Sequence, residues 1–205
     1  MSRPSNAPIS ATLPKPRFGQ RRSMRLPDYD YSIAGSFFVT ICARDRAAIF
    51  GSLRERRFYP NALGRIVESC WEEIPAHSPT VTLDEWVLMP NHLHGIVVNW
   101  GDKGATCRAP ADPRSPSAAF PPVVKNAEQP NKFGPLVANS LGSVVRAFKA
   151  AATKTARDSG AWSIGTIWQR GYHERLIRNA RELEDRHGYI RENPLKWATD
   201  HERLW

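Results

Sequence analysis

The hydrophobic pattern divides the chain into short runs typical of strands and longer segments typical of helices. An apolar, β-rich run at 37–42 predicts a first strand. Residues 81–88 and 92–99 predict two more strands, and the short turn between them makes the pair an antiparallel hairpin. Apolar residues at 167–168 and 175–177 predict one or two further short strands.

Three segments repeat apolar residues at helical spacing. The first follows Asn61, a favourable N-cap residue, and is expected to stop at Pro75. The second follows Ser140, and the third begins at Asn179 with a capping-box glutamate three residues on and is expected to end at Pro194. Because helices and strands are intermixed without regular βαβ alternation, the pattern predicts an α+β fold, a central antiparallel sheet with helices packed against it.

Two stretches lack this patterning. Residues 1–20 are polar and rich in proline and glycine, so we expect a disordered basic arm. Residues 101–135 are dominated by Pro, Ala, Gly and Ser, which indicates a disordered surface insertion. The rest, 21–205, is long enough for one hydrophobic core and is predicted to form a single domain interrupted by that insertion.

The chain carries a formal charge of +9, which points to an anionic partner and first of all to nucleic acid. Six basic residues and no acidic ones lie within 1–25, so much of the excess could belong to a solvated tail. A second basic cluster at 140–180 has seven basic residues against two acidic ones. Because this cluster lies in patterned sequence, it is the better candidate for a binding surface.

Cysteine usage and hydropathy favour a cytoplasmic protein. The three cysteines Cys42, Cys70 and Cys107 are widely spaced, and they form neither a metal-binding spacing nor a disulfide framework. No apolar stretch approaches the ~20 residues of a membrane helix. The basic N-terminus is not followed by the apolar segment of a secretory signal, so no membrane or export role is expected.

Two histidines, His92 and His94, flank Leu93 at the start of a predicted strand. Side chains at i and i+2 of a strand point to the same face, about 7 Å apart. Two imidazoles at this spacing can converge on one metal ion while Leu93 faces the opposite side. Alone, such a pair is more often incidental than metal-binding.

Tyr189 and Asn193 are four residues apart on the last predicted helix and would share one of its faces. A carboxamide oxygen beside two imidazoles is a suitable third ligand for a hard ion such as Mg²⁺ or Mn²⁺. Two points weigh against this interpretation. Pro194 disfavours helical geometry at Asn193, and a tyrosine on a terminal helix is usually a packing residue.

In combination these blocks resemble a known family, the REP-associated tyrosine transposases. Residues 89–98, MPNHLHGIVV, resemble the family's HUH motif (His-hydrophobic-His), and residues 189–197, YIRENPLKW, match its Tyr-Ile-x-x-Asn-Pro block. Further similar blocks lie at 25–31, 38–42, 144–149, 167–174 and 177–179. The resemblance therefore covers nearly everything except the N-terminal arm and the insertion.

The resemblance implies a ferredoxin-like HUH endonuclease fold and a divalent-metal DNA strand transferase with one catalytic tyrosine. Carried over by position, Tyr189 is the nucleophile, His92 and His94 are metal ligands, and Asn193 is the third ligand. Attack by the tyrosine would displace a 3′-OH and leave a 5′-phosphotyrosine. The chain departs from many related insertion-sequence enzymes, which have glutamine four residues after the tyrosine.

The expected partner is single-stranded or hairpin, REP-like DNA, bound by a monomer or a homodimer. The candidate DNA-binding residues are Arg146, Lys149, Lys154, Arg157, Arg170 and Arg178. For any one of them, a solvated helix face is an equally good interpretation. Trp168 and Tyr172 are candidates for stacking on bases. Tyr172 is also the rival nucleophile, but it lies in a predicted strand and has no match to the family's catalytic tyrosine.

Two other functions fit parts of this pattern. A domesticated, catalytically silent DNA-binding module could share the fold, although the presence of both histidines with Tyr189 and Asn193 favours an active enzyme. A relaxase or replication-initiator nickase shares the chemistry, but such enzymes usually carry a larger histidine cluster or a second tyrosine.

Overall fold

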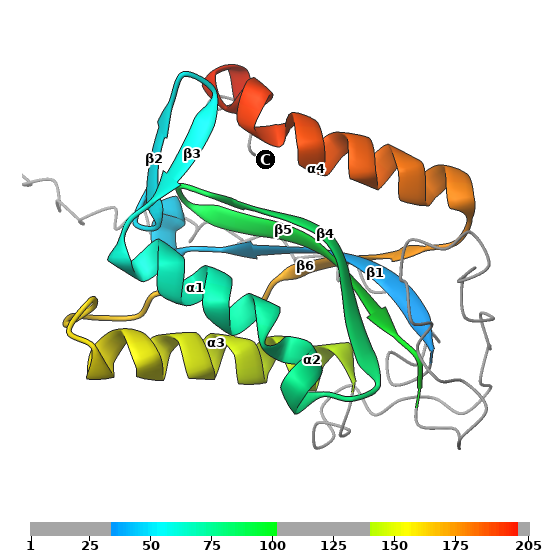
Figure 1. The fold of residues 1–205 in the computed structure, drawn as a ribbon, viewed down its shortest axis with the longest axis horizontal. Helices are drawn as coiled ribbons and strands as arrows, with labels where there is room; N and C mark the ends of the chain where they lie inside the picture. Colours follow the sequence, from blue (N-terminus) through cyan, green and yellow to red (C-terminus); the bar gives the residue numbers. More distant parts are fainter. Residues whose placement is uncertain (1–33, 102–139, 201–205) are drawn as a thin grey trace, which may run out of the picture.

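The computed structural model describes residues 34–101 and 140–200. The predicted arm at 1–20, and all but the first residue of the predicted insertion, lie outside the described residues. Figure 1 shows three layers: one helix above a twisted sheet and the other helices below it. The fold is α+β with an antiparallel sheet, so the predicted class is confirmed. None of the helices in the described ranges is both long and apolar enough to cross a membrane.

The main sheet has four antiparallel strands in the order β4-β5-β1-β6. The strands are β1 (Gly35–Cys42), β4 (Val81–Met89), β5 (His92–Asn99) and β6 (His173–Ile177). The central strands β1 and β5 are covered on both faces, so nearly all their residues are buried. This burial explains why β1 has a continuous apolar sequence and not an alternating one.

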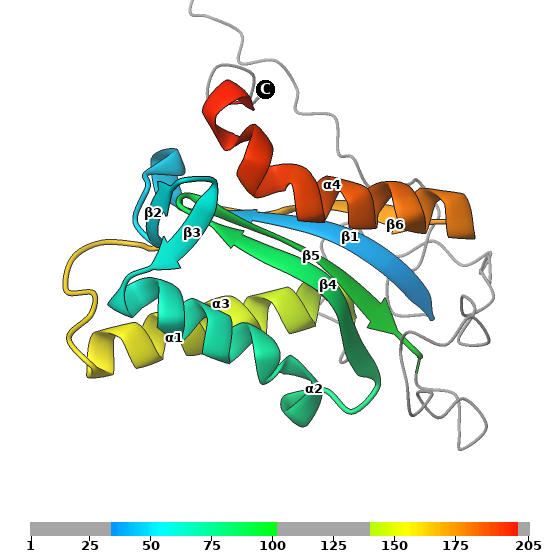
Figure 2. The same cartoon turned by 45° about the horizontal axis from the view of Figure 1, so that its top comes forward.

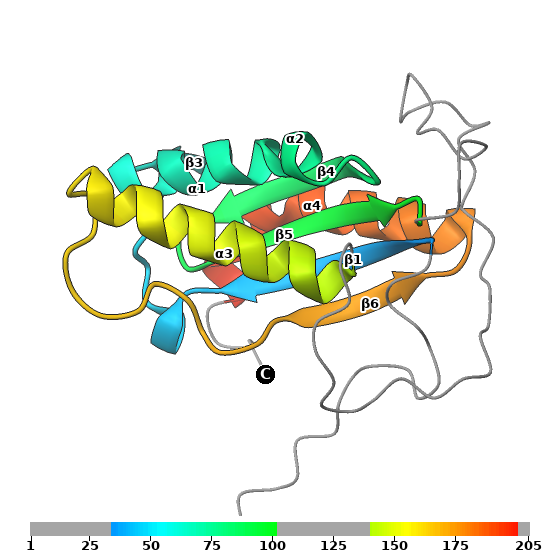
Figure 3. The same cartoon turned by 90° about the horizontal axis from the view of Figure 1, so that it is seen from below.

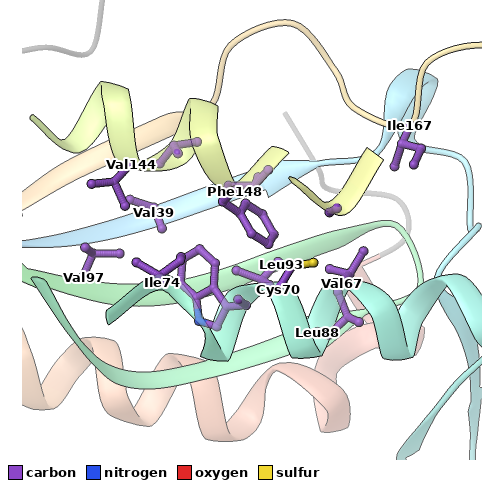
Figure 4. Packing of buried hydrophobic residues seen from close by; sticks show 14 of the residues in the cluster. Val39, Val67, Cys70, Ile74, Leu88, Leu93, Val97, Val144, Phe148 and Ile167 are labelled. Carbon is purple, nitrogen blue, oxygen red and sulfur yellow. The ribbon is translucent and has the colours of Figure 1, made fainter. Parts of the chain in front are cut away.

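One face of the sheet is covered by α1 (Ala62–Glu72), the short α2 (Ile74–His77) and α3 (Leu141–Asp158), as Figure 3 shows from below. Asn61 caps α1 as predicted, since its side chain accepts a hydrogen bond from the Gly64 amide. Figure 4 shows side chains of α1 and α3 packing on Val39, Leu93 and Val97. The helices therefore cover the odd-numbered positions of β1 and β5.

Gly95 lies on this helix-covered face, directly under the ring of Trp71. A Cβ atom at Gly95 would come within 2.6 Å of Trp71 Cζ2, and Trp71 is fully buried. We therefore expect Gly95→Ala to lower the free energy of unfolding by about 1–3 kcal/mol, because the indole has no space into which to move. Urea unfolding with an unchanged m-value measures this effect.

A second glycine supplies the control for that substitution. A Cβ at Gly188, within a helix, meets nothing within 4 Å. Gly188→Ala should therefore raise the free energy of unfolding by up to about 1 kcal/mol. Equal unfolding midpoints for Gly95→Ala and the wild type would show that the indole is not packed as described.

Of the described helices, α4 (Ala180–Asp200) is the one that covers the opposite face of the sheet. Asn179 caps it as predicted, but the Glu182 carboxylate accepts from the Arg178 amide and not from the cap residue. The prediction that Pro194 ends this helix was wrong: Pro194 lies inside α4. A proline inside a helix removes one backbone hydrogen bond and kinks the helix, but the helix can continue beyond the kink when its side chains are packed. Figure 2 shows the last turns of α4 running in a different direction from the first.

A β-bulge in β4 fixes α4 to the sheet. The pairing with β5 shifts between Leu83 and Trp86, so two residues occupy the space of one. Those residues, Asp84 and Glu85, both contact α4. The Asp84 carboxylate lies 2.8 Å from His187 Nε2, and Glu85 pairs with Arg191. The two contacts bracket Tyr189 and hold its part of the helix in place.

Three other expectations differ from the structure. The segment after β1, for which the hydrophobic pattern predicts no strand, contains the turn η1 (Arg44–Arg46) and a hairpin of β2 (Gly51–Arg54) and β3 (Arg57–Pro60). The turn of this hairpin lacks the usual Asn-Gly sequence. Its two central residues, Glu55 and Arg56, instead adopt the positive φ values that such a turn requires. Pro75 does not stop the helix begun at Asn61, which ends at Glu72, and instead lies in the first turn of α2. The predicted strand at 167–168 is only an isolated bridge from Ala43 to Trp168.

Candidate active site on the central strands

The two histidines of the predicted metal site lie side by side at the start of β5. Pairing with β1 places His92 opposite Cys42 and His94 opposite Thr40, on the face covered by α4. Their ring centroids are 4.4 Å apart, and both side chains are at least 96% buried. The i, i+2 spacing therefore produces the convergence that the sequence predicts.

Each imidazole is held through its Nδ1 atom. His92 Nδ1 lies 2.6 Å from Asn91 Oδ1, and His94 Nδ1 lies 2.8 Å from Thr40 Oγ1. Asn91 Oδ1 only accepts, so His92 donates from Nδ1 and its Nε2 carries the lone pair. His92 Nε2 is buried and meets no hydrogen-bond partner in the described part of the chain. An outer partner at Nδ1 and a lone pair at Nε2 is the usual arrangement of a metal-binding histidine.

Burial keeps both imidazoles neutral. Burial lowers the pKa of His92 to about 4, the amide of Asn193 offsets part of that change, and Arg46 adds to the lowering. The pKa of His94 is well below its ordinary value, chiefly because of burial and then because of the neighbouring His92 and Arg186. Neutral imidazoles are the form that binds metal, so protons do not compete for these ligands near pH 7.

The Thr40 hydroxyl gives a test of this outer shell. Thr40→Val keeps the side-chain shape and removes the partner of His94 Nδ1, so the Mn²⁺ affinity that we expect of the imidazole pair should fall about 10- to 100-fold. Isothermal titration with Mn²⁺ measures the change. Thr153→Val on α3, which also loses a side-chain hydrogen bond, is the matched control and should bind Mn²⁺ as the wild type does.

Tyr189 reaches the histidine pair from α4. Its phenol oxygen lies 3.4 Å from His94 Nε2, and the two ring centroids are 5.1 Å apart. Phe38 supports both rings: it stacks on His94 at 5.3 Å and meets Tyr189 edge-on at 5.8 Å. The phenol therefore points toward the imidazoles, and the side chain as a whole is only half-buried.

Asn193 lies one turn beyond Tyr189, and α4 remains helical through both residues. Its side chain is 95% buried and close enough to His92 to raise the pKa of that imidazole. No group of three His, Cys, Asp or Glu side chains is gathered for a metal ion anywhere in the described ranges. The side chain that approaches the two histidines from α4 is therefore a neutral amide, that of Asn193.

Arg186 and Trp197 also lie near this site and were not singled out from the sequence. The guanidinium carbon of Arg186 lies 5.1 Å from the centre of the Phe38 ring, and its charge reaches His94. Trp197 stacks on His92 with centroids 5.8 Å apart. Helical spacing from Tyr189 could have indicated Arg186, three residues earlier. The contact of Trp197 depends on the helix continuing past Pro194.

The predicted DNA-binding residues do not form one surface. Arg146, Lys154 and Arg157 are exposed on α3, as expected, but α3 lies on the face of the sheet opposite Tyr189 (Figure 1). Lys149 Nζ donates to the carbonyls of Gln169 and Gly171, at 3.1 and 2.5 Å. The structure therefore does not gather these four side chains beside the histidines.

The remaining candidates lie on other elements. Arg178 pairs with Glu182 at the start of α4, whereas Arg170 is exposed on the loop before β6. Phe148 is in the core as expected, and Trp168 packs between it and Phe50. Tyr172, the rival nucleophile, packs against the core beneath the sheet, away from the imidazole pair.

Comparison with known proteins gives one sequence relative and related solved structures. No protein-family model matches the chain. An uncharacterised protein of Haemophilus influenzae is 36% identical over 180 residues, which cover 88% of this chain and 91% of that protein. A REP-associated tyrosine transposase bound to a REP hairpin has a TM-score of 0.50 and 18% identity, over 85% of this chain and 74% of that one. A candidate transposase of Deinococcus radiodurans has a TM-score of 0.41 and 12% identity, over 82% and 95% of the two chains.

These matches establish two different things. The Haemophilus influenzae protein shares over a third of its aligned residues across most of both chains, which is enough to define a common family. The identity to the REP-associated transposase is lower, and that likeness establishes the fold. The chain therefore belongs to the same protein family as the Haemophilus influenzae relative and has the fold of a REP-associated tyrosine transposase.

Proposed function

We propose that the chain is a DNA strand transferase that cleaves and rejoins single-stranded or hairpin DNA through Tyr189. The phenol oxygen attacks a backbone phosphorus, a bond from oxygen to phosphorus forms, and the bond to the 3′ oxygen breaks. The products are a 5′-phosphotyrosine and a free 3′-OH. Because the covalent bond keeps the energy of the phosphodiester, a second 3′-OH can reseal the strand without ATP.

One observation carries this proposal: Tyr189 Oη lies 3.4 Å from His94 Nε2, although the two residues are 95 positions apart in the chain. A structural tyrosine could make the same hydrogen bond, so the support comes from its setting: the phenol meets two adjacent buried imidazoles, and Asn193 approaches one of them. The REP-associated transposase with the same fold was bound to a REP hairpin, and this supports hairpin DNA as the substrate class.

The residues present fit a divalent ion such as Mn²⁺ or Mg²⁺. His92 Nε2 is a buried nitrogen without a partner among the described residues, and Nδ1 of each histidine is already used. His92, His94 and the Asn193 amide would hold the ion. When bound, it would polarise a non-bridging phosphate oxygen and offset the charge that develops during attack.

Other side chains would favour the phenolate and hold Tyr189 and His94 in position. A free phenol has a pKa of about 10, so the positive charge of Arg186 near the site favours the phenolate and attracts the phosphate. Contacts of Asp84 and Glu85 with α4 hold Tyr189 in position. Phe38 fixes the orientation of both the nucleophile and His94.

The test is the covalent intermediate itself. The wild-type protein is incubated with a panel of labelled hairpins carrying single-stranded flanks, in the presence of Mn²⁺, and resolved on a denaturing gel. We expect a protein–DNA adduct, and peptide mapping should place the nucleotide on Tyr189. Binding of the hairpins without any adduct across the panel would instead support a catalytically silent DNA-binding module.

A further inference from the structure

A basic cleft of about 740 Å³ is formed by two segments that are distant in the sequence. Its walls come from η1, which follows β1, and from the loop that precedes β6. Three arginines line it, Arg44, Arg46 and Arg170, against the single carboxylate of Asp45. Trp168 contributes an aromatic wall.

The cleft is built by contacts between two distant segments. The Arg44 amide donates to the Ile167 carbonyl at 2.8 Å, and the Gln169 amide donates to the Cys42 carbonyl at 2.9 Å. Lys149 supports the loop from below through the carbonyls of Gln169 and Gly171. These backbone bonds hold the two walls at a fixed separation, so the hollow exists without a ligand.

The backbone of η1 is strained where it forms the cleft. Asp45 and Arg46 both have φ of 52°, in the left-handed region, although neither is glycine. Such conformations cost about 1–3 kcal/mol each and are concentrated at functional sites. Here they turn the chain so that Arg44 and Arg46 both line one hollow. The Arg44 side chain contacts Asp45 and Thr166 but remains 60% exposed.

The cleft is joined directly to the proposed metal site by Asn91. The side-chain amide of Asn91 donates to the Arg46 carbonyl at 3.1 Å, and its oxygen contacts His92 Nδ1 at 2.6 Å. A single side chain thus connects the wall of the cleft to an imidazole of the active site. This connection between the cleft wall and His92 is the reason to assign the cleft to a nucleotide that flanks the proposed cleavage site.

We propose that this cleft binds a single-stranded nucleotide flanking the cleaved bond, with phosphate held by the arginines and a base against Trp168. Guanidinium groups with an aromatic wall form the usual site for single-stranded DNA. The exposed Arg146 and Lys154 side chains of α3 do not line the cleft. The claim that this nucleotide flanks the cleaved bond rests on the proposed function, but the claim that the cleft binds single-stranded DNA does not.

The experiment removes charge from the cleft in a Tyr189→Phe background, in which no adduct can form. The variant is Arg44→Gln with Arg170→Gln, and the matched control is Arg146→Gln with Lys154→Gln on α3. Fluorescence anisotropy with labelled oligothymidylate of about twelve nucleotides measures the dissociation constant at several salt concentrations. We expect about a tenfold or greater loss of affinity for the cleft variant, and a salt slope smaller by about 0.7 for each phosphate that is no longer neutralised. The α3 control should bind as the parent does.

Two further measurements distinguish the loss of a DNA contact from a displaced loop. Arg170→Gln alone leaves the Arg44–Thr166 hydrogen bond intact, so a loss of affinity in this variant cannot arise from a displaced loop. Cross-linking of bromodeoxyuridine DNA should map to residues 44–46 or 166–170. Unchanged affinity in both cleft variants, or an equal loss in the α3 control, would overturn the proposal.

The result is independent of the test of the proposed function. Loss of strand binding in the cleft variant, together with a wild type that never forms an adduct, would retain the subsite and reject the transferase. An adduct formed at the wild-type rate by a cleft variant with intact Tyr189 and unchanged strand affinity would reject the subsite and retain the transferase.

Discussion

Replacing Tyr189 with phenylalanine is expected to abolish the covalent protein–DNA adduct while leaving the fold and DNA affinity nearly unchanged. The substitution removes only the oxygen that lies 3.4 Å from His94 Nε2, and the edge-on contact with Phe38 remains. Removal of a nucleophile in another covalent enzyme costs on the order of 10⁶ in rate, so the adduct should fall below detection on a denaturing gel. Removal of the phenol hydrogen bond should change the stability by no more than about 1 kcal/mol.

Tyr172→Phe is the matched control for this prediction. It removes the same hydroxyl group from the other candidate nucleophile, whose ring packs on the opposite side of the sheet. We expect the control to form the adduct at the wild-type rate. An adduct that survives in Tyr189→Phe and disappears in Tyr172→Phe would reverse the assignment of the nucleophile.

The parts of the fold that the sequence predicts best are those set by local patterns. The strand containing 37–42 has an almost continuous apolar run, the strand at 92–99 follows a short turn after another β-rich run, and the cap at Asn61 needs only its own helix. The hairpin of β2 and β3 was missed because its residues are largely exposed and its turn uses Glu55 and Arg56. Nothing in a local pattern marks two ordinary charged residues as a left-handed turn.

The candidate site could be predicted only in part, for a similar reason. The geometry of His92 and His94 follows from strand periodicity alone, and Tyr189 was placed with them by family resemblance. Thr40 was missed because its contact with His94 depends on the register between β1 and β5, which no local signal sets. The anchors Asp84 and Glu85 depend on a bulge. Such contacts arise from the pairing of segments far apart in the chain.

The position of the basic helix α3 relative to the sheet could not be predicted from helical periodicity. Helical spacing correctly separated its buried side from an exposed side with Arg146, Lys154 and Arg157. Spacing does not reveal which face of the sheet a helix will cover. The structure places α3 beneath the sheet and α4 above it, so a charged stripe that seemed close to the chemistry lies on the far side (Figure 1).

Replacing His92 with alanine is expected to remove the stabilisation that the proposed divalent ion would give the wild type. An ion present at about 100 times its dissociation constant stabilises the folded state by about 2.7 kcal/mol. For a domain of this size the melting temperature should then rise by roughly 5–10 °C when Mn²⁺ is added to the wild-type protein. His92→Ala loses the buried nitrogen without a described partner, so its melting temperature should not respond to Mn²⁺. Thermal melts with and without Mn²⁺ or a chelator measure the difference.

His77→Ala provides the control, because His77 is exposed on α2 and lies outside the histidine pair. It should keep the full response to Mn²⁺, whereas His92→Ala should also lose adduct formation by at least about 10³-fold. The shift in melting temperature separates a lost ion from a damaged fold, since a damaged fold lowers the melting temperature without added metal and leaves the response to metal in place. If Mn²⁺ stabilised His92→Ala as strongly as the wild type, the ion would bind elsewhere and the imidazole pair would need another role.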